Sequence, residues 1–135
     1  MALFGGLGNY KNFGLLVIRV GLGIMFIYHG YPELGGGPKM WAELGSSTKY
    51  VGIHFWPLVW GLLSAAVETF GGFLLIIGLA FRPVCLLMLI NLLVAAAMHF
   101  GKGDGLEGAA HAIEDAIVFA GLLFVGPGRN SVDKK

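Results

Sequence analysis

Apolar residues along the chain form long uninterrupted segments, not the short alternating runs that strands show. A helix that crosses a bilayer needs about 20 mostly apolar residues. Four segments fit this requirement: residues 13–34, 57–80, 83–100 and 108–126. The sequence lacks the alternating ten-residue pattern that is typical of membrane β-barrels. The pattern therefore predicts an all-α membrane protein.

Glycine and proline mark the ends of these segments. A Gly-Gly-Gly-Pro run at 35–38 ends the first segment, and Pro57 suits the first turn of the second. Arg82 and Pro83 make a tight joint before the third segment, and Gly-Pro-Gly at 126–128 ends the fourth. The connections predict a four-helix transmembrane bundle with up-down-up-down topology. We expect residues 1–135 to form one domain.

The connection over residues 35–56 is the longest. It contains a possible short interfacial helix at about 38–44, which either covers the mouth of the bundle or is a simple surface connection. All three tryptophans, Trp41, Trp56 and Trp60, lie in or beside it. Tryptophan concentrates at membrane interfaces, so this end of the bundle is expected to carry an aromatic belt.

Composition excludes several other classes of protein. Only 13% of the residues are charged, about half the share in soluble domains. High hydrophobicity excludes disorder, and a single cysteine excludes a disulfide scaffold. A net charge of +1 without a basic stripe argues against nucleic-acid binding. The bilayer is the expected environment.

Basic residues in short connections set the expected orientation. One side of the membrane would carry Lys11, Arg82, Arg129, Lys134 and Lys135. The other side would carry Lys39, Lys49 and Lys102. The excess favours a bacterial-type cytoplasmic (inner) membrane, crossed several times, with both termini in the cytoplasm. The first segment carries Arg19 and no small-residue cleavage site follows it, so we expect it to stay as a helix.

Small residues recur along one face of the second segment and predict close helix packing. This face contains Gly61, Ser64, Ala65, Glu68, Gly71, Gly72, Leu75 and Gly78. The same face carries Glu68, one of several polar residues inside the spans. Ionisable groups are costly there and usually have partners. These polar residues are Arg19, Glu68, Asn91, Glu114 and Asp115. We predict that Arg19 pairs with Glu68, shared with Asp115, either to fix helix register or to relay protons.

A second polar group is expected at the opposite end from the termini. His29 shares a helix face with Glu33, and His111 shares one with Glu114 and Asp115. His99 ends the third segment, and His54 lies in the long connection. Such a group could bind a divalent metal, ligate a haem, or move protons at a quinone site. It could equally consist of structural histidines. Cys85 is expected to act as a small apolar residue.

These features resemble the DoxX-like family of small four-helix membrane proteins. The matching positions in the first segment are Arg19, Gly23, Phe26, His29 and Gly30. Those in the second are Glu68, Gly71, Gly72, Leu75, Gly78 and Leu79, followed by Arg82 and Pro83. The run G-P-G-R-N-S-V-D at 126–133 is similar to the closing G-P-G-x-x-S-x-D of the family. Family members often have lysine soon after the first-helix glycine, where this chain has Tyr-Pro-Glu, so no basic role is carried over there.

The resemblance implies one of two kinds of function. Relatives include the DoxD-type subunit of thiosulfate:quinone oxidoreductase and proteins linked to thiol oxidative stress. More distant relatives are cargo receptors or assembly helpers without catalytic activity. The first hypothesis is therefore a quinone-interacting oxidoreductase subunit linked to thiol or sulfur redox chemistry. The alternative is a non-catalytic scaffold or accessory subunit of a larger membrane complex. In either case we expect the chain to form a homo-oligomer or to be a subunit of a membrane complex.

Under the redox hypothesis, a quinone head group lies near the histidines and carboxylates. His29, His99 and His111 are the candidate cofactor-binding residues and, with Glu114 and Asp115, the candidate acid–base groups. Glu68 and Arg19 would provide a deeper relay. Flavin, nicotinamide and iron–sulfur signatures are missing from the sequence. Electrons would then pass to a partner subunit or to a bound haem or metal.

Overall fold

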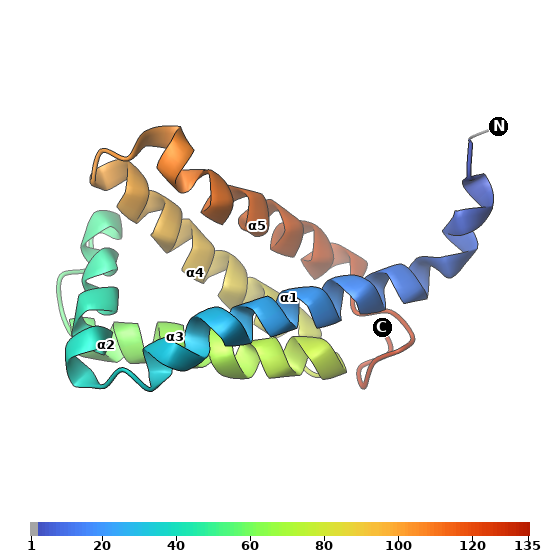
Figure 1. The fold of residues 1–135 in the computed structure, drawn as a ribbon, viewed down its shortest axis with the longest axis horizontal. Helices are drawn as coiled ribbons and strands as arrows, with labels where there is room; N and C mark the ends of the chain where they lie inside the picture. Colours follow the sequence, from blue (N-terminus) through green and yellow to red (C-terminus); the bar gives the residue numbers. More distant parts are fainter. Residues whose placement is uncertain (1–2) are drawn as a thin grey trace.

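The structure is a computed structural model that describes residues 3–135 (Figure 1). The helices of this part of the chain are η1 (Gly5–Tyr10), α1 (Lys11–Leu34), α2 (Pro38–Gly45), η2 (Ser46–Val51), α3 (Pro57–Ile77), α4 (Phe81–Gly101) and α5 (Gly105–Val125). The two η elements are short 3-10 helices, and none of these residues forms a strand. Helices α1, α3, α4 and α5 are long and apolar enough to cross a membrane. The predicted all-α membrane fold is confirmed.

Helix α3 ends three residues before the expected position. Gly78 adopts a left-handed conformation with φ of 71°, and its N–H donates to the carbonyls of Leu74 and Leu75. This is the conformation that glycine adopts at the C-terminal ends of helices. The turn leaves room for α4 to begin at Phe81, ahead of Pro83, which lies in its first turn. A proline is tolerated there because the first N–H groups of a helix have no partner within it.

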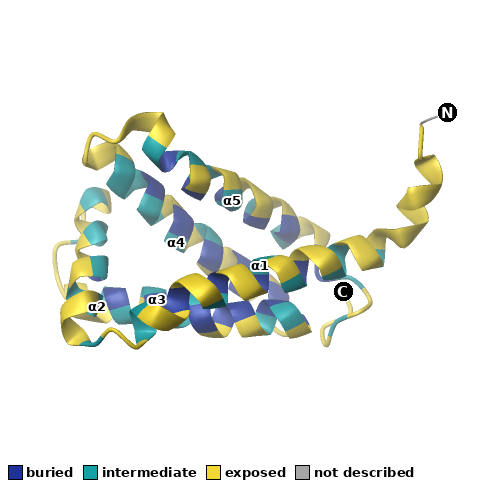
Figure 2. Ribbon diagram, in the orientation of Figure 1, coloured by how far each residue is buried: buried dark blue, intermediate teal, exposed yellow. Residues whose placement is uncertain are grey.

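The four long helices form two pairs, with α1 packed along α3 and α4 packed along α5 (Figure 1). We call the end where α1 begins and α5 ends the terminal end, and the opposite end the loop end. The pairs diverge toward the loop end in Figure 1. They meet nearer the middle, where the rings of Phe26 and Phe119 lie 5.4 Å apart edge to face. Both residues are buried. In Figure 2, buried positions recur along the long helices among exposed ones.

Helix α2 and η2 run across the loop end between the two pairs (Figure 1). Gly45 in α2 and Gly61 in α3 face each other so closely that a Cβ on either would overlap a carbonyl of the other helix. On the far side, the hydroxyl of Ser47 donates to the sulfur of Met98 in α4 at 3.1 Å. The expected short helix is therefore present, and it covers the loop end of the bundle.

Glycine contacts set how far α1 is displaced along α3. A Cβ on Gly23 would lie 2.5 Å from the carbonyl oxygen of Gly72, and one on Gly72 would lie 2.6 Å from that of Gly23. Farther along, the Cβ position of Gly30 is 2.7 Å from the hydroxyl of Thr69. Real Cβ atoms do not approach other atoms so closely, so only glycine allows these helices to lie at this distance. The small-residue face of α3 is buried against its neighbours, as the sequence predicts.

Residues 126–135, which we call the closing segment, fold back onto the joint between α3 and α4. The N–H of Val132 donates to the carbonyl of Ile77, and the N–H of Asp133 donates to that of Gly78, both at 3.0 Å. The Asp133 carboxylate accepts the N–H groups of Ala80 at 3.1 Å and Phe81 at 2.7 Å, at the start of α4. The closing G-P-G-x-x-S-x-D pattern therefore connects the end of the chain to the joint.

Candidate functional site

A chain of half-buried polar side chains joins α3 to α4 near the middle of both helices. The hydroxyl of Ser64 donates to Oδ1 of Asn91 at 2.7 Å. Nδ2 of Asn91 in turn donates to Oε1 of Glu68 at 3.0 Å. Both bonds link α3 with α4, so the amide fixes the position of the Glu68 carboxyl group. Polar side chains hold membrane helices together in this way.

Glu33 of α1 completes this group from the other side. Gly30, one turn earlier on the same face, brings α1 against the Cβ of Glu68. The two carboxyl groups lie within hydrogen-bonding reach of each other. Oε2 of Glu33 and Oε2 of Glu68 are both buried and have no hydrogen-bond partner among residues 3–135. Two carboxyl groups in contact can hold a proton between them.

The end of α1 is anchored beside this carboxyl pair by Trp41. Its Nε1 lies 3.0 Å from the carbonyl of Glu33 and 3.2 Å from that of Leu34, and donates to both. Carbonyls in the last turn of a helix have no partner within the helix. Trp41 therefore satisfies the last turn of α1 and links it to α2. It is one of the tryptophans expected in the aromatic belt, and its ring nitrogen donates to the end of α1.

His29 and His111 lie together where α1 approaches α5. Their ring centroids are 6.5 Å apart. Both residues are exposed on the surface of the bundle. His111 Nε2 lies 3.6 Å from Oδ2 of Asp115, one turn along α5, and the His29 ring lies one turn before Glu33. Surface histidines thus adjoin the half-buried carboxyl pair.

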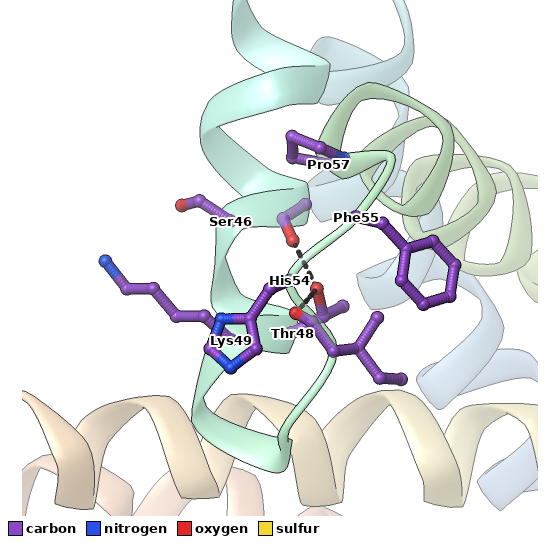
Figure 3. Close-up of a pocket in the computed structure, with 8 residues that line it drawn as sticks. Ser46, Thr48, Lys49, His54, Phe55 and Pro57 are labelled. Carbon is purple, nitrogen blue, oxygen red and sulfur yellow. Dashed lines mark hydrogen bonds between the residues drawn. The ribbon is translucent and has the colours of Figure 1, made fainter.

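His99 and His54 occupy other places. Nδ1 of His99 lies 2.8 Å from Oδ2 of Asp104, in the turn between α4 and α5. His54 lines a pocket of about 170 Å³ in the connection before α3, beside Lys49 and Phe55 (Figure 3). The hydroxyl of Thr48 shapes this pocket by contacting the carbonyls of Gly45 at 2.9 Å and Ile53 at 3.0 Å. The structure therefore brings together two of the four histidines.

The predicted Arg19–Glu68 pair is wrong. Arg19 is 1% exposed and its Nη2 donates to the carbonyl of Asn130, in the segment that folds back. Its Nη1 lies against Gly78, at the terminal end of α3. Ten residues separate Gly78 from Glu68 along α3, or about 15 Å. The prediction relied on the long Arg19 side chain to bridge the gap toward Glu68, whereas its guanidinium lies against Gly78 and Asn130 at the terminal end. Asp115 likewise contacts His111, not Arg19.

Two further residues lie apart from the carboxyl pair. Glu114 is exposed on α5, and none of the described residues forms a salt bridge with it. Cys85 is fully buried in the core. Within residues 3–135, no three His, Cys, Asp or Glu side chains are grouped so that they could hold a metal ion.

Sequence reasoning did not place Glu33 among the candidate site residues. It recognised only that Glu33 shares a face with His29. The available signal was its position within the first apolar segment, where a carboxyl group needs a partner as much as Glu68 does. Asn91 was recognised as a polar residue inside a span, but its role in positioning Glu68 depends on the packing of α3 against α4.

These features describe a multi-pass α-helical membrane protein with a carboxyl pair between its helices. A family model described as DoxX matches residues 14–101, which is more than half of the chain. The chain belongs to the DoxX family. The matched range covers α1 to α4 and ends before α5 and the closing segment. Comparison with curated proteins and with solved structures found no match.

Proposed function

We propose that this protein is a quinone- or quinol-interacting subunit of a membrane redox complex linked to thiol or sulfur chemistry. In this proposal its single DoxX domain lies in a bacterial-type inner membrane with both termini in the cytoplasm. The observation that carries the proposal is the carboxyl pair of Glu33 and Glu68 beside the exposed pair of His29 and His111. A quinone in the bilayer could reach the histidines from the lipid.

The chemistry requires groups that take up protons. Oxidation of a quinol releases two electrons and two protons. The electrons would pass to a redox centre in a partner subunit. His29 and His111 would accept protons from the quinol hydroxyls, with Asp115 orienting His111. The Glu33–Glu68 pair would take a proton onward, and Asn91 would keep Glu68 in place.

Labelling with an azido-quinone tests binding directly. The protein in nanodiscs would be photolabelled as wild type, as the double variant His29→Ala/His111→Ala, and as His54→Ala. His54 is an exposed histidine outside the proposed site and serves as the matched control. We expect labelling to be lost in the double variant and retained in the control. Undiminished labelling of a folded double variant would refute the proposal.

Glu68→Gln separates binding from proton transfer. Glutamine keeps the size of the side chain and an acceptor for Asn91, but it cannot release a proton. We expect the variant to bind quinone and to lose quinol-dependent turnover in the native complex. Full turnover in this variant would exclude Glu68 from the proton path.

An accessory role without chemistry is the second candidate, and Glu114 favours it. Glu114 is nine residues from the start of α5, or about 14 Å, which places it near the middle of a bilayer roughly 30 Å thick. Charged side chains at such depth almost always face protein or water. A partner subunit or second copy covering α5 would meet this need.

Extraction in mild detergent tests the accessory role. We expect Glu114→Leu to lose a stoichiometric partner that the wild type retains. Glu107→Leu, at the exposed first turn of α5, is the control. A wild-type protein that migrates alone as a monomer would refute this candidate.

A further inference from the structure

A basic pocket of about 550 Å³ lies at the terminal end, between the start of α1 and the segment that follows α5. It is separate from the carboxyl pair, which lies between the last turn of α1 and the middle of α3. Four of its lining residues are basic: Lys11, Arg129, Lys134 and Lys135. Its lining includes no acidic residue. Asp133 lies outside this lining, and its two oxygens accept N–H groups at the start of α4.

The same pocket has an apolar side. Leu15 and Ile18 of α1 and Val125 at the end of α5 line it. These two α1 residues lie about one and two turns inside the helix that Lys11 begins. The pocket therefore crosses from the apolar part of the bundle to its charged end. A small hydrophilic anion would match only the basic side of this lining.

Hydrogen bonds between side chains and the backbone hold the two sides of the pocket together. The Oδ1 of Asn12 accepts the N–H of Arg129 at 2.8 Å, which joins α1 to the closing segment. The hydroxyl of Ser131 donates to the carbonyl of Gly128 at 2.6 Å and accepts the N–H of Lys134 at 2.9 Å. These bonds place Arg129 and Lys134 in a fixed turn. The basic residues thus share a defined site and are not scattered along a loose tail.

We propose that this pocket binds an anionic phospholipid, with the phosphate among the basic side chains and an acyl chain along Leu15, Ile18 and Val125. Basic pockets at the ends of membrane helices recognise anionic lipid headgroups. Charge favours an anionic lipid over a zwitterionic one, and the apolar side favours a lipid over free phosphate. The bound lipid would connect α1, α5 and the closing segment.

Native mass spectrometry of the full chain in detergent tests this proposal. The protein would be titrated with phosphatidylglycerol and with phosphatidylcholine of the same acyl chains, and separately with inorganic phosphate as a competitor. The variant of the site removes three charges: Lys11→Gln, Arg129→Gln and Lys134→Gln. The matched control removes three charges from the loop end: Lys39→Gln, Lys49→Gln and Lys102→Gln. A third variant keeps the charges: Lys11→Arg, Arg129→Lys and Lys134→Arg.

We expect the wild type to prefer phosphatidylglycerol, and the site variant to lose roughly a hundredfold of that preference, about fivefold for each basic residue. The control and the charge-keeping variant should retain it. Equal losses in the site variant and the control would overturn the proposal, because the effect would then follow net charge alone. Complete displacement of the lipid by millimolar phosphate would also overturn it. If the triple variant does not fold, the single substitutions provide the same test at about fivefold each.

Discussion

Replacing Asp133 with alanine tests whether the closing segment stabilises the joint between α3 and α4. The residue before α4, Ala80, adopts a left-handed conformation with φ of 51° and offers no side-chain cap. The carboxylate of Asp133, 52 residues farther along the chain than Phe81, accepts the first N–H groups of α4 instead. Alanine removes both acceptors and leaves the closing segment held by its backbone bonds.

The expected loss of stability follows from these two bonds. Hydrogen bonds to a charged group contribute about 1.5–3 kcal/mol each where they are buried. The bond to Ala80 is exposed and the bond to Phe81 is only partly buried, so the two together are expected to contribute less than twice the lower limit of that range. Losing a helix cap costs about 1 kcal/mol in general. We expect Asp133→Ala to lower the free energy of unfolding by about 2 kcal/mol, and Asp133→Asn, which keeps one acceptor, by about 1 kcal/mol.

The single cysteine of the chain provides the assay. Cys85 is fully buried in α4, so a thiol-reactive fluorophore should label it only as the protein unfolds. The unfolding temperature in detergent should fall in the order wild type, Asp133→Asn, Asp133→Ala. Glu43→Ala removes an exposed carboxylate elsewhere and should leave it unchanged. Equal unfolding temperatures for Asp133→Ala and the wild type would refute the capping role.

Two further substitutions test the packing of α1, α3 and α4. Gly72→Ala places a Cβ 2.6 Å from the carbonyl oxygen of Gly23. We therefore expect α1 to separate from α3 and the unfolding temperature to drop. Gly21→Ala is the control, because its Cβ meets nothing within 4 Å and should leave the unfolding temperature unchanged. Asn91→Leu leaves Oε1 of Glu68 buried without its donor, and should cost about 1–2 kcal/mol in the free energy of unfolding. A fully stable Asn91→Leu protein would contradict the proposed positioning of Glu68.

Much of the fold could be predicted from the sequence because its signals are local. The length of each apolar segment, the glycine and proline residues between them, and the small-residue face of α3 all act within one helix or one turn. The short helix α2 also follows from a local signal, although the sequence leaves open whether it covers the mouth of the bundle or is a simple surface connection. The spacing of the closing G-P-G-x-x-S-x-D pattern is enough to indicate a resemblance to the family. That spacing does not indicate that this segment contacts the start of α4.

The site depends on distances between helices that no local pattern contains. Glu33 meets Glu68, and Arg19 lies near Gly78, because glycine contacts displace α1 along α3 by a set amount. A different displacement would pair other residues of the same two helices. The sequence by itself determined which residues within the membrane-spanning segments are polar. Such residues are rare in apolar segments, so each one can be read directly from the sequence. Only tertiary packing decided which of them meet, because helix pairing depends on close contacts between residues far apart in the chain.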